Sequence, residues 1–172
     1  MATITYTSRE EIEVHRFSAA ATIGVPLAAL FFQIYVSSRF TFLKLIDLPL
    51  LVTIFFAVSR RNQLAGMLTG CAIGLTQDAL THLPIGIYGI CKTIIGYGAS
   101  SIGLKVDVDN PGSRFLMVLF FTFLHDGLYF IVRRNLLGIP SDWRTLHELS
   151  AALSNALVAV VLFALLDRTK KR

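Results

Sequence analysis

The chain has 172 residues, of which 54% are hydrophobic and only 16% are charged. Soluble domains carry about 25% charged residues, so this composition excludes an ordinary water-soluble globular core. The formal net charge is +5, and the Lys and Arg residues gather at the ends of apolar runs. This distribution favours a role in membrane orientation and in contact with anionic lipid over a role in binding nucleic acid.

Six apolar stretches follow one another along the chain, after a polar segment, MATITYTSREEIEVHRF, that lacks a signal-peptide pattern. A helix crosses a bilayer with about 20 apolar residues, so six spans use nearly the whole chain and leave no room for an aqueous catalytic domain. We therefore predict an all-α integral membrane protein, a single domain of six transmembrane helices in one bundle. The expected spans are 17–36, 40–58, 64–80, 83–104, 115–132 and 149–166.

Two boundaries carry local signals. Lys44, Asp47 and Pro49 interrupt the second apolar run, so its beginning is expected to be interfacial or irregular. A very short turn, THLP, separates the third run from the fourth, and Pro84 suits the first turn of the fourth helix.

Basic residues predict the orientation. With a cytoplasmic N-terminus, ten of them fall inside and five outside, and Lys92 is left within a span. The excess predicts a multi-pass membrane protein with both termini in the cytoplasm. The inner residues are Arg9, Arg16, Arg60, Arg61, Lys105, Arg114, Arg168, Lys170, Lys171 and Arg172, and the outer ones are Arg39, Lys44, Arg133, Arg134 and Arg144.

Small residues form stripes on three of the expected helices. Gly66, Gly70, Gly74 and Asp78 recur every four residues and lie on one face of a helix. Glycines let two backbones approach closely in lipid, so the stripes predict a compact bundle that packs mainly within this chain, with docking of another protein as the alternative. The other two stripes are Gly89, Thr93, Gly96, Ser100 and Gly103 in the fourth run, and Ala20, Gly24 and Ala28 in the first.

Charged residues inside the spans need partners, because a charge at the bilayer centre costs about 2.5–3.5 kcal/mol on insertion scales. Asp78, Lys92 and Asp126 are all expected in the outer half of the membrane, with Gln77 and His125 at similar levels. We predict that Lys92 is neutralised by Asp78, by Asp126 or by both. A structural role for this polar cluster is favoured over partner docking, and docking over catalysis.

Enzyme chemistry finds no support in the motifs. Asp78 and Asp126 resemble a membrane aspartyl-protease pair, but a neighbouring Lys92 would keep both ionised and oppose a shared proton. No HExxH, CxxC or phosphate-binding glycine loop is present. Cys71 and Cys91 are read as apolar fillers, so neither a metal nor a cofactor is expected.

Residues 47–100 resemble the central region of the rod shape-determining protein MreD family. The matching features, in order, are Asp47 with Pro49, the Arg60–Arg61 loop, a glycine-striped helix ending in Gln77–Asp78, Pro84-x-Gly86, and Gly96–Tyr97. Lys92 is not part of that pattern, so its pairing is predicted from this sequence alone.

The resemblance implies a non-enzymatic subunit of the bacterial inner membrane, in the complex that builds the lateral peptidoglycan wall during elongation. It implies docking to MreC, a single-span protein with a large periplasmic part, through a glycine stripe or the region of Asp78. MreB filaments, a glycan polymerase and a penicillin-binding transpeptidase would be further partners through the complex. Arg60, Arg61 and the tail 168–172 are candidates for contact with lipid or MreB, although solvated charge is favoured.

The resemblance also implies the fold of the substrate-binding subunits of energy-coupling-factor transporters, which supplies an alternative function. A vitamin-binding subunit would place an outward-facing pocket at the level of the polar cluster. Against this alternative, the outer loops carry one Trp, Trp143, and few other aromatics to stack on a vitamin ring.

Overall fold

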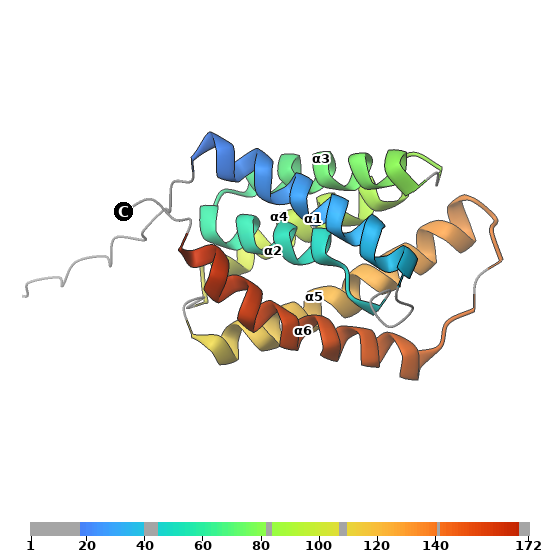
Figure 1. Ribbon diagram of the computed structural model, residues 1–172. Helices are drawn as coiled ribbons and strands as arrows, with labels where there is room; N and C mark the ends of the chain where they lie inside the picture. The colour runs from blue at the N-terminus through green and yellow to red at the C-terminus, as the bar shows by residue number, and fades with distance from the viewer. Residues whose placement is uncertain (1–17, 40–44, 82–83, 107–109, 141, 169–172) are drawn as a thin grey trace, which may run out of the picture.

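Figure 1 shows the computed structural model, which describes residues 18–39, 45–81, 84–106, 110–140 and 142–168. The polar N-terminal segment, Lys44, the residues 82–83 of the predicted turn and the basic tail 169–172 lie outside the described residues. Within the described residues every regular element is helical, and the predicted all-α architecture with six α-helices is confirmed. The helices are α1 (Ala19–Arg39), α2 (Leu48–Arg60), α3 (Gln63–Thr81), α4 (Ile87–Gly103), α5 (Pro111–Ile131) and α6 (Thr145–Asp167), and a π-helical turn, η2 (Val132–Leu136), extends α5.

The six helices run back and forth between two ends of one bundle (Figure 1). The blue start of α1 and the dark red end of α6 lie at the same end, which we call the terminal end. The opposite end, which we call the distal end, holds the starts of α2, α4 and α6. At the terminal end Arg114 of α5 forms an ion pair of 2.7 Å with Asp167 of α6.

The apolar helix α2 occupies the middle of the bundle. Its residues from Pro49 to Ser59 are all buried. They form one core with apolar side chains of α4, α5 and α6, and the rings of Phe55 and Phe163 lie 5.2 Å apart between α2 and α6. The helix begins at Leu48, and residues 40–44, where the run was expected to begin irregularly, lie outside the described residues.

Helices α3 and α4 pack backbone against backbone along the glycine stripe. A Cβ atom built on Gly70 would lie 2.7 Å from the carbonyl carbon of Lys92, and one on Gly74 would lie 2.7 Å from the Cα of Gly89. A Cβ on Gly66 would collide with the Ser100 hydroxyl. The stripe is therefore filled by α4 of the same chain.

The small stripe of α1 has a different environment. Ala20, Gly24 and Ala28 are exposed, and a Cβ on Gly24 would meet no atom within 4 Å. This stripe does not pack within the described part of the chain.

Two helices are long and apolar enough to cross a membrane by length and composition, among the residues that the structure describes. These are Pro111–Leu136, with a mean hydropathy of 1.9, and Thr145–Asp167, with a mean hydropathy of 2.3. Ala20–Tyr35 and Leu48–Arg60 are shorter apolar helices.

Candidate functional site

Lys92 forms an ion pair with Asp47. Its Nζ atom lies 3.0 Å from Oδ1 and 2.8 Å from Oδ2 of that carboxylate, and the Lys92 side chain has no exposed surface. The prediction that Lys92 pairs with Asp78 or Asp126 is therefore wrong. Lys92 sits in the middle of α4, and the packing of α4 on the start of α2 places Asp47 within its reach.

Asp47 is held in place by three elements. Its carboxylate accepts the N–H of Leu50 at 2.9 Å, which caps α2, and its backbone N–H donates to Oδ1 of Asn155 in α6 at 2.9 Å. Gln33 of α1 accepts the N–H of Leu48 at 3.1 Å and donates to the carbonyl of Ile46 at 2.7 Å. The residues before α2 thus link α1, α2, α4 and α6. Gln33 in α1 and Asn155 in α6 are isolated amide side chains in apolar helices. They were the sequence signal for these contacts, and the sequence analysis did not use it.

Asp78 has a separate role at the α3–α4 connection. Its buried carboxylate accepts the backbone N–H groups of Gly86 at 2.9 Å, Tyr88 at 3.1 Å and Gly89 at 3.2 Å. These N–H groups open α4, where an anion is stabilised by unpaired donors and by the helix dipole. Gly86 supports this cap with a backbone φ of 113°, which glycine adopts without strain. Pro84 lies in the turn before α4, outside the helical turn expected for it.

Replacing Asp78 by Ala is expected to lower the free energy of unfolding by about 2–3 kcal/mol, because buried N–H groups at the start of α4 lose their acceptor. Asp78→Asn should cost less, since its amide oxygen still accepts. The measurement is the thermal unfolding midpoint in one detergent. Thr76→Val is the control, because the half-buried Thr76 hydroxyl donates only within α3, to the carbonyl of Ala72. Equal midpoints for Asp78→Ala and this control would contradict the cap.

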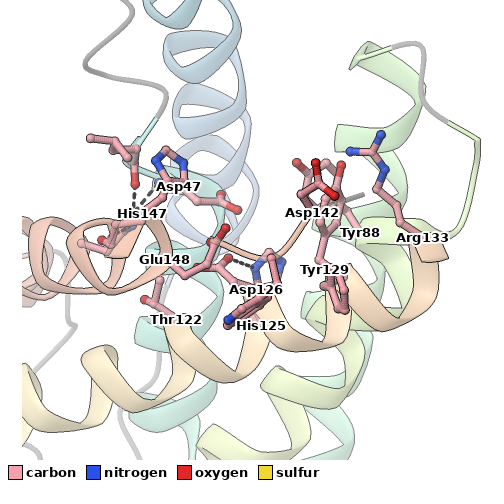
Figure 2. Close-up of a pocket in the computed structure, with 15 residues that line it drawn as sticks. Asp47, Tyr88, Thr122, His125, Asp126, Tyr129, Arg133, Asp142, His147 and Glu148 are labelled. Carbon is pink, nitrogen blue, oxygen red and sulfur yellow. Dashed lines mark hydrogen bonds and ion pairs between the residues drawn. The ribbon is translucent and has the colours of Figure 1, made fainter. Parts of the chain in front are cut away.

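A pocket of about 290 Å³ opens between α5 and α6 at the distal end (Figure 2). The start of α2 and the first turn of α4 close it on the inner side. Its lining is dominated by polar and aromatic side chains, unlike the apolar core around α2. The lining residues are Leu45, Asp47, Tyr88, Thr122, His125, Asp126, Tyr129, Phe130, Arg133, Asp142, Trp143, His147, Glu148, Ala151 and Asn155.

Aromatic rings form one wall of the pocket. The ring of Tyr88 stacks on Tyr129, with centroids 5.0 Å apart, and on His125 at 5.9 Å. Trp143 packs edge-on against Phe130 at 5.5 Å. Most rings of this pocket therefore come from helices and not from the outer loops, which carry few aromatic residues.

Three buried polar atoms in the pocket wall have no hydrogen-bond partner within the described ranges. These atoms are Oγ1 of Thr122, Nε of Arg133 and Nε2 of His125, whose side chain is 3% exposed. The other ring nitrogen of His125 lies 3.1 Å from Oδ1 of Asp126. Buried polar groups are normally paired, so such atoms in a pocket wall mark a place where a ligand can bind.

The remaining predicted residues are placed as follows. Asp126 reaches the pocket with its side chain 22% exposed. Gln77 is 5% exposed and its Oε1 atom has no partner in the described part of the chain. His125 and Asp126, which the sequence analysis expects at similar levels of the membrane, both line the pocket.

These features define a helical protein with apolar helices of membrane length, a buried ion pair and a polar pocket at one end of its bundle. Residues 15–167 match the family described as rod shape-determining protein MreD, so the chain belongs to the MreD family. The resemblance seen in the sequence is thereby confirmed: this is a non-enzymatic helical membrane protein that acts in rod shape determination with the cell-shape machinery. No curated protein and no solved structure matches the chain significantly. The expected likeness to energy-coupling-factor subunits stays a prediction.

Proposed function

We propose that this protein is a scaffold subunit of the peptidoglycan elongation complex and that it docks MreC at the distal pocket. In this proposal it lies in the bacterial inner membrane with six spans. Both termini are cytoplasmic, so the distal end faces the periplasm. The excess of basic residues toward the terminal end supports this orientation.

The pocket, whose wall holds three buried polar atoms without a hydrogen-bond partner in the described residues, is the observation that carries the docking proposal. The glycine stripe of α3 is already covered by α4, and Asp78 is used in the cap of α4. The α3 stripe and Asp78 thus have a structural role within the chain, whereas the α1 stripe stays exposed in the described residues. The pocket opens toward the compartment in which the large part of MreC would lie, which favours it over the faces in contact with lipid.

Photo-crosslinking to full-length MreC in cells tests this proposal. Benzoylphenylalanine in place of exposed His147, at the pocket, is expected to crosslink to MreC. Exposed Leu165 is the matched control, since it lies 18 residues later on the same face of α6, five helical turns away. Crosslinks at Leu165 and none at His147 would place docking on the membrane face and contradict the proposal.

A small-molecule-binding role is the second candidate, and the pocket volume is the observation in its favour. Ligand pockets usually measure about 300–1,000 Å³, so this one is at the small end of that range. Mass spectrometry of the purified protein distinguishes the two roles. A tightly held vitamin would support transport, whereas co-purifying MreC supports the scaffold role.

A further inference from the structure

The pocket contains more negative than positive charge. Four carboxylates line it, from Asp47, Asp126, Asp142 and Glu148. Lys92 neutralises Asp47. Figure 2 shows Glu148 and Asp126 close together, Glu148 from α6 and Asp126 from α5. Among the described residues neither Glu148 nor Asp142 forms an ion pair, so the outer part of the pocket favours a cation.

Arg133 also lines the pocket, but its side chain does not contact this acidic part. The guanidinium of Arg133 lies 5.6 Å from the centroid of the Tyr129 ring, and Arg133 forms no ion pair within the part of the chain that the structure describes. Its Nε atom is buried without a partner. Within the described residues Arg133 thus forms no ion pair with Asp126 or Glu148, whose basic neighbours are the histidines His125 and His147.

The hydrogen-bond acceptors of the pocket suit a ligand that donates several N–H groups. If Nδ1 of His125 donates to Asp126, the unpaired Nε2 of the neutral ring is an acceptor. The Thr122 hydroxyl is a second unpaired acceptor on the same face of α5, three residues earlier. With the carboxylates, the pocket offers acceptors at several angles.

The rings of Tyr88, Tyr129 and Phe130 each have a cation over them already, which leaves Trp143 as the large aromatic ring of the lining without one among the described residues. Aromatic faces attract cations, and a planar guanidinium both stacks on rings and donates five N–H bonds, which a lysine ammonium cannot do.

From these contacts we propose that the distal pocket takes an arginine side chain of MreC, from the extracytoplasmic segment next to its membrane span. This inference rests on the proposed docking of MreC at the pocket. The Glu148 and Asp126 carboxylates receive the guanidinium, the buried Thr122 and His125 acceptors bind its remaining N–H groups, and Trp143 offers its ring to the guanidinium plane.

The sign of the charge effects tests this inference. Binding of full-length MreC is measured in nanodiscs of phosphatidylglycerol. Glu148→Gln is expected to weaken binding about tenfold, and Glu148→Asp much less, because it keeps the charge. Arg133→Gln should strengthen binding about threefold, because it removes repulsion of the incoming cation. Arg134→Gln is the matched control, since Arg134 is the next residue and stacks on Phe130 at 5.7 Å but does not line the pocket.

The partner residue is found by a double-mutant cycle. Each arginine of the membrane-proximal segment of MreC is replaced by Gln. One replacement should weaken binding as much as Glu148→Gln does, and combining the two should weaken it little further.

Weaker binding with Arg133→Gln and stronger binding with Glu148→Gln would show an anionic ligand and overturn the inference. A Glu148→Gln effect that appears only when phosphatidylethanolamine is added would assign the site to a lipid ammonium and also overturn it. Wild-type protein that fails to bind MreC at all would instead refute the proposed function.

Discussion

Replacing Lys92 by Met is expected to lower the free energy of unfolding by about 3–5 kcal/mol, because the carboxylate of Asp47 then loses its buried counter-ion. The side chain of Lys92 is fully buried, and that of Asp47 is 21% exposed at the pocket, so water can solvate only part of the carboxylate that is left behind. The thermal unfolding midpoint of the purified protein in one detergent measures the change. Lys105→Met, at an exposed position just after the same helix, is the control and should shift stability by no more than about 0.5 kcal/mol.

A double variant separates the ion pair from simple packing. Lys92→Met combined with Asp47→Asn should recover most of the lost stability, since no buried charge is left uncompensated. Asn is also a good N-cap residue, so the capping bond to Leu50 is retained in this variant. A Lys92→Met protein that unfolds at the wild-type midpoint would mean that the pair does not hold the bundle together.

The need of Lys92 for an acidic partner could be predicted from the sequence, but the identity of that partner could not. The cost of a charge in lipid depends on composition and depth alone. Asp47 lies 45 residues before Lys92, and only the packing of α2 in the centre of the bundle brings the two together. Asp78 lies nearer in sequence but finds local partners in the N–H groups of α4. The carboxylate of Asp78, which is nearer to Lys92 in sequence, is thus satisfied by backbone N–H groups and does not pair with Lys92.

The helices were predictable for a related reason, since long apolar runs and the glycine spacing are periodic signals within a single element. The pocket was not, because its walls come from α4, α5, η2 and α6 and from the residues that precede α2 and α6. A partial signal did exist on α5. Thr122, His125, Tyr129 and Arg133 recur at spacings of three and four residues and therefore form a polar stripe on one face of an apolar helix. Such a stripe indicates a face turned to a polar interior.

Replacing Gly70 by Ala is expected to lower the free energy of unfolding by about 1–3 kcal/mol, and Gly70→Leu by more, because the new side chain enters the α3–α4 contact. A Cβ at this position would collide with the carbonyl oxygen of Lys92, which is backbone and cannot rotate away. The clash therefore has to be relieved by separating the two helices. The shift of the thermal unfolding midpoint measures this cost.

Gly24→Ala and Gly127→Ala are the matched controls, because a Cβ on either glycine meets no atom within 4 Å. Alanine forms helices better than glycine by about 1 kcal/mol, so both controls should be neutral or stabilising. Separation of α3 from α4 would also displace the backbone that carries Lys92, so Gly70→Ala should weaken the ion pair with Asp47. The costs of Gly70→Ala and Lys92→Met should then sum to more than the cost of the double variant. Equal midpoints for Gly70→Ala and Gly24→Ala would show that α3 and α4 do not pack this closely. The α3–α4 contact could then not be what positions Lys92 beside Asp47.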